Sequence, residues 1–547
     1  MPFSYNLSTE INHVIIKSRI FMFYGVETFI FAFALILLNS MGVNCISKIT
    51  KNDLVKLVDN AADLIRTSVD YKYILVLLFI KRLSDRWKEE IEDAMSEIME
   101  ETGIDESEAA KRAVSNEFHS FMVPENVLWN NIRKDRDKLT ENMSRAINEI
   151  AKENKELDGV VNRIDFIDFT KTRENRLLLE QLFALFDKYN FSNKCIEGDA
   201  MGDAYEHILM RFAPEKAKEG EVYTPREVVR LMVDILDPQP GMTVYDPACG
   251  SGGMLLEAYE HVKSRMGVDK ANRVGLYGEE RSPTTYALAK MNTILHDISE
   301  SHLEVGDSLL YPKFKTASGL RHFDFVLANP PWSQKGYGED TLKQAEFKDR
   351  YAYGFVPQRY GDWAWIEHML YTAKSKVAVI MDQGALFRSN SEKVIRQKIV
   401  DEKLLDSVIL LPEKIFYNTG AAGVILIFNR EKKEEYKDKV LFIDASKEYG
   451  KHPDMRKLNI ITNDNIDRIV SAYRKFESID GFSKVVSVDE IKANDYNLNV
   501  TTFVSPINNE SSIDITGTIE ELNEINADLS EVEKKLNGYL KELGYID

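Results

Sequence analysis

Four consecutive residues, Asn329, Pro330, Pro331 and Trp332, form the segment of this sequence best suited to chemistry. They follow Phe323-Asp-Phe-Val-Leu-Ala, a run typical of a buried strand, and two prolines end a strand and stiffen the next loop. The Asn329 side-chain oxygen and the Pro330 carbonyl can each accept an N–H from a planar exocyclic amine, while Trp332 stacks on the ring. The loop therefore favours group transfer to such an amine by positioning and electrostatics, without a metal.

A glycine-rich turn, Asp246-Pro-Ala-Cys-Gly-Ser-Gly-Gly253, lies upstream between an expected strand at Met242–Asp246 and an expected helix. Backbone N–H groups at such a helix start face a ligand, and Gly250, Gly252 and Gly253 let it approach without Cβ clashes. The turn is not a dinucleotide fingerprint, because residue 255 is Leu, and no G-K-[ST] makes it a phosphate loop. Asp246 would repel a pyrophosphate but suits a ligand carrying an ammonium or sulfonium group.

Two further carboxylates follow the next two expected strands. Glu280 comes after Val274–Tyr277, where an acid in a Rossmann-type sheet accepts hydrogen bonds from ribose hydroxyls. Asp307 comes after His302–Val305 and is placed to accept from an exocyclic amine such as that of adenine. Taken alone, Glu280 is better explained as a helix-cap carboxylate and Asp307 as a turn or N-cap residue. Their order together with the glycine turn and the Asn-Pro-Pro-Trp loop makes chance improbable.

Alternating strand and helix patterns after Pro214 must position these residues. They include an expected helix at Pro283–His296 and further strand-like runs at Val377–Met381, Ser407–Leu411, Gly423–Phe428 and Val440–Ile443. Such alternation predicts an α/β fold, a Rossmann-like doubly wound methyltransferase sheet that is mainly parallel and binds its ligands at the carboxyl ends of the strands.

The segment from Lys51 to about Phe191 has a different pattern. Apolar residues recur at spacings of three and four, and Pro and Gly are rare, which predicts an α-helical domain. Its basic clusters, Lys81-Arg82 and Arg133-Lys134-Asp135-Arg136, are individually best explained as solvated surface.

The two ends of the chain are distinctive. Ile20–Leu38 is nearly all apolar, which is compatible with a membrane span or signal peptide, but we favour a translation start at Met41. Near the other end, apolar residues at alternating spacings of three and four predict a short coiled-coil seam that packs on its own domain or on a partner. These residues are Leu522, Ile525, Leu529, Val532, Leu536, Tyr539 and Leu543. The expected domains are 1–45, an apolar extension; 46–200, helical; 201–480, catalytic; and 481–547, a partner-binding tail with a helix at 519–544.

Composition narrows the class of protein. The chain has 547 residues, 44% of them hydrophobic, and its three cysteines form no C-x-x-C pair, which argues against a disulfide scaffold or a cysteine zinc site. A net charge of -18 means that the chain should bind a duplex poorly unless local basic patches or a partner supply attraction.

As a set, the motifs resemble the amino-methyltransferases of nucleic acids and, more closely, the modification (methyltransferase) subunit of type I restriction-modification systems. The resemblance extends from about Lys51 to the C-terminus, but not over residues 1–40, and Glu279 stands where relatives often have Gln. The matching segments are Ala62–Arg66, Lys81–Asp85, Glu221–Arg226, Asp246–Gly253, Asn329–Trp332, Leu411–Pro412 with Phe416–Gly420, and Asp495–Asn499.

This resemblance implies a cytoplasmic, S-adenosylmethionine-dependent, adenine-specific N6 DNA methyltransferase in which Asn329–Trp332 holds a flipped base. The implied cofactor contacts are Ser251, Gly252 and Gly253 at the methionine part, Glu280 at the ribose, Asp307 at the adenine, and Glu221, Val222, Tyr223, Thr224, Pro225 and Arg226 over the cofactor. It also implies double-stranded DNA, a specificity subunit that chooses the site, a restriction (motor and nuclease) subunit, and two copies of this chain per complex. The helical domain would clasp DNA, and the tail would join the specificity subunit.

The residues alone leave alternatives open. One is a methyltransferase for another planar amine or amide, such as an RNA base or a protein glutamine, which the long helical domain and the tail disfavour. The residues do not decide between adenine N6 and cytosine N4, for which only the resemblance, at Asn329, favours adenine. The other is a non-catalytic S-adenosylmethionine-binding scaffold, which the intact Asn-Pro-Pro-Trp loop disfavours. Cytosine-C5 chemistry needs a nucleophilic cysteine in a separate loop, whereas Cys249 lies in the glycine turn.

Overall fold

The computed structural model describes residues 48–65, 70–218, 223–298, 301–417, 419–453, 455–504 and 515–542. The expected apolar extension, residues 1–45, and the expected cofactor residues Glu221 and Val222 lie outside the described residues. None of the described helices is both long enough and apolar enough to span a membrane.

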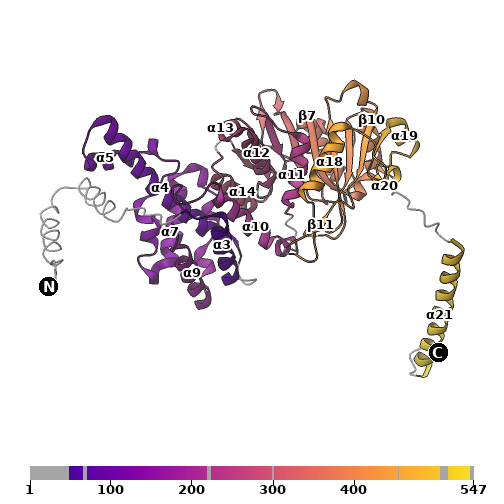
Figure 1. Cartoon of the computed structure of the whole chain (residues 1–547), viewed down its shortest axis with the longest axis horizontal. Helices are drawn as coiled ribbons and strands as arrows, with labels where there is room; N and C mark the ends of the chain where they lie inside the picture. Colours follow the sequence, from indigo (N-terminus) through magenta and orange to yellow (C-terminus); the bar gives the residue numbers. More distant parts are fainter. Residues whose placement is uncertain are drawn as a thin grey trace.

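The first part of the described chain is helical, as the apolar spacing predicts (Figure 1). Its longest helix, α4 (Lys72–Thr102), is buried on every side through its first turns, so it forms the centre of this part. The other helices are α3 (Lys51–Ile65), α5 (Glu106–Ala113), α6 (Trp129–Ile132), α7 (Leu139–Glu153), α8 (Phe166–Phe169), α9 (Arg173–Phe186) and α10 (Ala200–Lys218).

The interpretation of Lys81-Arg82 as solvated surface is wrong, because both side chains are about 5% exposed. Lys81 pairs with Asp85 one turn along α4, and Arg82 donates to the backbone carbonyl of Phe191. Burial lowers the pKa of Arg82 to about 10. A buried cation is tolerated when it is paired or hydrogen-bonded, and the acceptors for Arg82, at Phe191 and Asn193, lie more than a hundred residues along the chain. The Arg133–Arg136 cluster is exposed, as expected.

The remainder of the chain is built on a nine-stranded, mainly parallel sheet with the order β13-β10-β8-β9-β7-β6-β1-β2-β3, which confirms the predicted doubly wound fold. Among these strands, β9 runs antiparallel to both of its neighbours, and β13 runs antiparallel to β10. The strands are β1 (Thr243–Asp246), β2 (Gly275–Glu280), β3 (Ser301–Val305), β6 (Phe323–Ala328), β7 (Ala373–Asp382), β8 (Leu405–Leu410), β9 (Gly423–Asn429), β10 (Lys439–Asp444) and β13 (Ser483–Ser487).

Helices cover both faces of the sheet, as the nearly continuous apolar strands require. One apolar core joins the sheet to α11 (Arg226–Leu236), α12 (Gly253–Met266) and α18 (Asn463–Lys475). A second joins it to α16 (Asp362–Thr372), α17 (Ser391–Asp401), α19 (Val488–Ala493) and α20 (Val500–Phe503). Short elements at the periphery are α13 (Val268–Ala271), α15 (Glu339–Leu342), and the hairpins β4 (Lys315–Thr316) with β5 (Gly319–Leu320) and β11 (Gly450–Lys451) with β12 (Asn459–Ile460).

The helical part and the sheet part share an apolar core through α10 and α14 (Pro283–Leu295). The buried Tyr205 hydroxyl on α10 donates to the carbonyl of Leu288 on α14 at 3.0 Å. Farther along the same contact, a Cβ at Gly202 would lie 2.3 Å from Nε2 of His296, so only glycine allows this close approach. The two parts are therefore packed directly against each other.

The last described element is helix α21 (Ile515–Glu542), which spans most of the helix expected at 519–544 and stands clear of the other elements in Figure 1. The expected apolar stripe lies on this helix and is exposed: Leu522 57%, Ile525 63%, Leu529 54%, Val532 61% and Leu536 54%. The side chain of Tyr539 and the whole of Leu543 lie outside the described part of the chain.

Candidate active site

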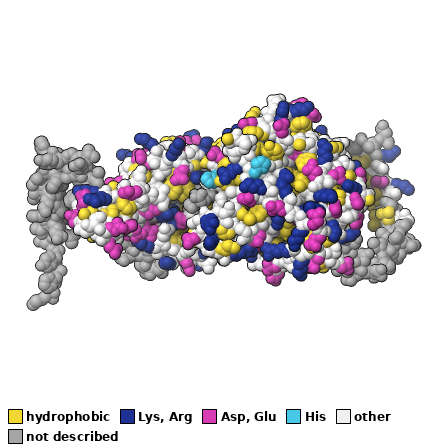
Figure 2. All heavy atoms as spheres, turned by 90° about the horizontal axis from the view of Figure 1, so that it is seen from above, with side chains coloured by type: hydrophobic (Ala, Val, Ile, Leu, Met, Phe, Trp, Pro, Cys, Tyr) yellow, Lys and Arg dark blue, Asp and Glu magenta, His cyan; other side chains and the backbone are white. Residues whose placement is uncertain are grey.

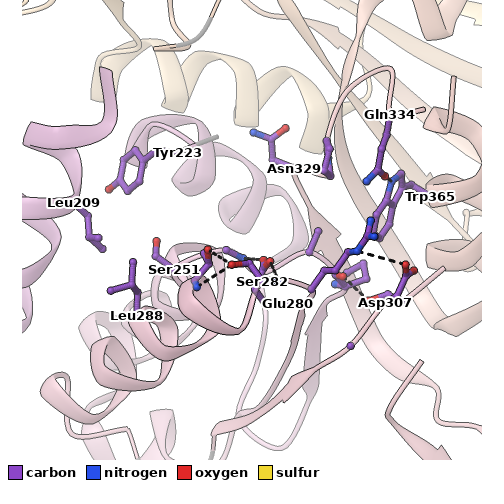
Figure 3. Close-up of a pocket in the computed structure, with 18 of the residues that line it drawn as sticks. Leu209, Tyr223, Ser251, Glu280, Ser282, Leu288, Asp307, Asn329, Gln334 and Trp365 are labelled. Atoms are coloured by element: carbon purple, nitrogen blue, oxygen red, sulfur yellow. Dashed lines mark hydrogen bonds and ion pairs between the residues drawn. The ribbon is translucent and has the colours of Figure 1, made fainter. Parts of the chain in front are cut away.

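The expected site residues meet at the carboxyl edge of the sheet, where the chain leaves β1, β2, β3 and β6. A cavity of about 510 Å³ opens there, with Ser251, Glu280 and Asp307 along one side and Tyr223 and Asn329 along the other (Figure 3). Parallel strands bring their carboxyl ends to one edge, so residues from four separate segments come together. Gly250 and Pro331 also line this cavity.

A smaller cavity of about 50 Å³ adjoins the first and shares Tyr223, Gly250, Ser251 and Asn329 with it. Four more of the expected residues, Thr224, Arg226, Asp246 and Gly253, line this smaller space.

Four expected residues, Pro225, Gly252, Pro330 and Trp332, line neither cavity. Gly252 instead shapes the turn: its φ is +85°, and a Cβ there would lie 3.5 Å from the Cβ of Ala289 on α14. Pro225 precedes the first residue of α11.

Glu280 lies at the end of β2 with its carboxylate in the larger cavity. It accepts hydrogen bonds from the N–H of Gly250 at 3.0 Å and from the N–H of Ser282 at 2.7 Å, so it ties the glycine turn to the start of α14. The neighbouring Glu279 points the other way, into the protein, where it accepts from the hydroxyls of Tyr245 and Ser308. Of the two acids, Glu280 is the one that faces the cavity.

Asp307 follows β3 and has two roles in the folded chain. One carboxylate oxygen accepts from the N–H of Leu310 at 3.1 Å, as a turn residue does, and the other accepts from the hydroxyl of Tyr337 at 2.7 Å. Tyr337 lines the cavity and was missed in the sequence, because it reaches the site from a loop with no motif. Burial and the contact with Asp307 raise the pKa of Tyr337, so the phenol remains a hydrogen-bond donor.

Asp246 ends β1 and is almost completely buried, at 2% exposure. Among the described residues, its one hydrogen-bond donor is the N–H of Ala248, at 3.0 Å. Burial raises the pKa of Asp246 to about 8, and the nearby Glu280 carboxylate adds to the rise. A buried carboxyl without a cation beside it is costly to ionise, so this position favours a positively charged ligand group.

Asn329 is held by two side chains. Its Nδ2 donates to the hydroxyl of Thr224 at 2.9 Å, and its Oδ1 accepts from the indole N–H of Trp332 at 2.9 Å. An indole nitrogen can only donate, so the atom facing it must be the amide oxygen, which fixes the orientation of the amide. The Trp332 ring packs edge-on against Phe416, with 5.0 Å between the ring centres, and is half-buried outside the cavity.

The residue after this loop, Ser333, shows how the loop is anchored. It has a φ of +51°, which is unusual for a residue with a side chain, and its N–H donates to Asp362 on α16 at 2.7 Å. Asp362 is itself fully buried and pairs with Arg388. The direction in which the loop leaves the sheet is therefore fixed by its hydrogen bond to the buried Asp362–Arg388 ion pair.

Arg226 begins α11, and its half-exposed side chain contacts three carboxylates. Its guanidinium lies 3.4 Å from Asp203 and Glu206 on α10 and 3.3 Å from Glu257 on α12. Burial acts to lower the pKa of Arg226, but the three carboxylates outweigh it and raise this pKa. Arg226 therefore holds three helices together at the wall of the smaller cavity.

Other residues that line the cavity carry no sequence signal. Trp365 on α16 donates through its indole N–H to the side-chain oxygen of Gln334 at 3.0 Å, and both border the cavity opposite Ser251 (Figure 3). The helical part supplies Tyr71, Leu209 and Ala213. Only the position of Gln334, two residues beyond the Asn-Pro-Pro-Trp loop, could have suggested its place.

Comparisons with known proteins agree with this geometry. The family model described as N-6 DNA Methylase matches residues 196–512, and the model described as HsdM N-terminal domain matches residues 54–186. The type I restriction enzyme MjaVIII methylase subunit of Methanocaldococcus jannaschii is 42% identical over 511 residues, which cover 91% of this chain and 86% of that protein. The type I restriction enzyme HindI methylase subunit of Haemophilus influenzae is 31% identical over 428 residues, covering 73% and 91%.

A solved structure adds to this similarity. The type I restriction-modification system methyltransferase subunit from Streptococcus thermophilus matches with a TM-score of 0.70 and 29% identity, covering 83% of this chain and 100% of that chain. With a doubly wound sheet, a glycine turn and an Asn-Pro-Pro-Trp loop at one cavity, this chain belongs to the N-6 DNA methylase family, among the methylase subunits of type I restriction enzymes.

Proposed function

We propose that this chain transfers a methyl group from S-adenosylmethionine to the N6 amine of adenine in DNA. The observation that carries the proposal is the position of Asn329, which borders the same cavity as Glu280 and Asp307. Asn329, which can bind an amine, thus lines the same cavity as Glu280 and Asp307, which can bind a nucleoside. Methyl transfer requires the donor and the amine to be held close together in this way.

The residues of the cavity fit the cofactor. Glu280 and Asp307 offer carboxylate oxygens to ribose hydroxyls and to an adenine amine, and Asp246 offers a buried carboxyl to the ammonium of the methionine part. Gly250 and Ser251 expose backbone at the turn. When bound, S-adenosylmethionine supplies an electrophilic methyl group on a sulfonium sulfur.

The role of Asn329 follows from its two hydrogen bonds. Because Thr224 accepts the amide N–H, the amide cannot turn over without losing that bond, and its oxygen stays directed away from Thr224. A carbonyl oxygen has two lone pairs, and the indole of Trp332 uses one of them. The second can accept an N–H from the adenine amine, which increases electron density on the nitrogen as it attacks. The base must leave the duplex to reach this point.

We also propose that the chain works in a type I complex with a specificity subunit, a restriction subunit and double-stranded DNA, with two copies of this chain. The exposed apolar stripe of α21 supports contact with the specificity subunit, since such a stripe is normally covered. A separate recognition subunit is compatible with a net charge of -18, and the helical part would contact DNA or a partner.

The test is methyl transfer by the full chain co-expressed with its specificity subunit, comparing wild type with Asn329→Ala. The matched control is Asn148→Ala, since Asn148 is an exposed asparagine on α7. We expect the first variant to bind cofactor, measured by calorimetry, but to lose at least a hundredfold in rate, and the control to keep full activity. Base analysis of the product and of the host genome distinguishes N6-methyladenine from N4-methylcytosine. Full methylation by Asn329→Ala, or label found on RNA or protein, would refute the proposal.

A further inference from the structure

Another, shallower cavity of about 470 Å³ lies beside the two cavities of the active site and differs from them in charge. Four basic side chains line it: Lys414 in the loop after β8, Lys451 on β11, and Arg456 and Lys457 in the β11–β12 hairpin. We call these four residues the basic rim. All four are exposed.

The basic rim lies on the same edge of the sheet as Asn329. Strand β8 runs parallel to β10 and, through the antiparallel β9, in the same direction as β7 and β6. The segments that follow β8 and β10 therefore leave the sheet at the edge where Asn329 follows β6. The backbone N–H of Asn459 donates to the carbonyl of Lys414 at 2.8 Å, which joins the hairpin to the loop after β8.

Two aromatic residues separate the basic rim from the active site and contact both. Phe416 lines the basic cavity and packs against Trp332 of the catalytic loop at 5.0 Å. Its neighbour Tyr417 also lines the basic cavity and lies 5.9 Å from Tyr223, which borders the cofactor cavity. A molecule that fills the active site therefore emerges next to the basic rim.

Within the described part of the chain, none of the four rim cations lies within ion-pair distance of a carboxylate. Other basic side chains in the same region do form ion pairs. Nearby, Arg468 on α18 pairs with Glu448 at 2.6 Å. Within the described part of the chain, the Lys451 ammonium donates to the side chain of Asn459 and lies over the ring of Tyr449, and both groups are neutral. Lys414 has a φ of +58°, a conformation with a cost for any residue that has a Cβ, which is compatible with selection for its charge.

Cations that pair with no described carboxylate are informative in this protein, because its net charge is otherwise unfavourable for binding nucleic acid. The net charge is -18, and basic and acidic side chains are intermixed on the face seen in Figure 2. Attraction to a phosphate backbone must therefore come from local groups. We propose that the basic rim binds the phosphodiester backbone of the strand being methylated, at the phosphates beside the flipped nucleotide. This inference rests on the proposed function and adds the surface that holds the strand.

The test measures DNA affinity against salt for the full chain in complex with its specificity subunit. The variant is Arg456→Gln with Lys457→Gln, and the matched control is Lys270→Gln with Arg273→Gln. Lys270 and Arg273 are one exposed lysine and one exposed arginine at the amino end of β2, the opposite edge of the sheet. The probe is a fluorescein-labelled duplex carrying the sequence found methylated in the host genome, followed by anisotropy over a series of KCl concentrations.

Each phosphate contact contributes about 0.9 to the slope of log K against log salt, so the rim variant should lose about 1 to 2 from that slope. Its affinity at low salt should fall about tenfold, with cofactor affinity and melting temperature as checks on folding. The control should match wild type. Equal slopes for the rim variant and the control, in a complex that still methylates DNA, would overturn this inference and leave the proposed function standing. If the rim variant associated more weakly with the specificity subunit but kept the wild-type slope, the rim would bind an acidic segment of that subunit. This result would also overturn the inference. A wild-type complex that neither binds nor methylates DNA would refute the proposed function itself.

Discussion

The buried carboxyl of Asp246 offers a direct test of how the site is prepared for a cationic ligand. Burial raises its pKa from 3.8 to about 8, so near neutral pH the folded protein holds this carboxyl mostly protonated. Replacing it with asparagine keeps the shape and the hydrogen bond from Ala248 but removes the titration.

The size of the effect follows from the two pKa values. Because the folded chain binds this proton more tightly than the unfolded chain, the group's contribution to stability is complete below pH 3.8 and is lost as the pH rises through 8. Integrating between about pH 6 and about pH 9 gives a loss of roughly 3 kcal/mol for wild type. The Asp246→Asn variant has no such loss. Its unfolding free energy relative to that of wild type should therefore increase by this amount between the two pH values.

The assay is urea unfolding followed by tryptophan fluorescence, at both pH values, for wild type and Asp246→Asn. The control is Asp444→Asn, since Asp444 also ends a strand and accepts an N–H two residues on, at 3.0 Å. We expect the difference from wild type to change with pH for the first variant and to stay constant for the control. A difference for Asp246→Asn that does not change with pH would show that the carboxyl is already ionised, and the argument for a cation site would fail.

Three further outcomes are expected. Thr224→Val should lower the methyl-transfer rate about tenfold by freeing the Asn329 amide, with cofactor affinity from calorimetry nearly unchanged and Thr224→Ser restoring the rate; equal rates in the Val and Ser variants would contradict this. Tyr337→Phe should weaken cofactor binding about five- to tenfold, because Asp307 loses its hydroxyl donor, and an unaltered dissociation constant would argue against that role. Leu529→Asp should prevent co-purification with the specificity subunit, whereas Ser530→Asp beside it should not; retention of the partner by both variants would remove the stripe from the interface.

Much of the fold could be predicted from the sequence because its signals are local. The strands after Pro214 are short apolar runs bounded by turn residues, and every strand expected there is present. Strand β13 was missed because it has only five residues, with few apolar ones, and gains its stability by pairing with β10. The burial of Lys81 and Arg82 was missed for a related reason, since the acceptor for Arg82 lies far along the chain at Phe191.

In the candidate active site, too, some features could be predicted from the sequence and others could not. Asn329, Glu280 and Asp307 lie at strand ends, and strand ends in a parallel sheet meet, so their convergence on one cavity could be anticipated. Trp332 was expected to stack on the base, but the sequence does not reveal that its indole bonds to Asn329. The role of Thr224 was equally hidden, because it depends on how the start of α11 folds over the loop.

Helix α10 belongs both to the wall of the larger cavity and to the helical part, so a structural change in one of them can affect the other. Leu209 and Ala213 enclose the cavity, while the same helix is packed into the core of the helical part. A change in the tilt of α10 would therefore also change the width of this cavity. Because linkage is reciprocal, a ligand of the helical part that tightens cofactor binding is itself bound more tightly, by the same free energy, when the cofactor is present.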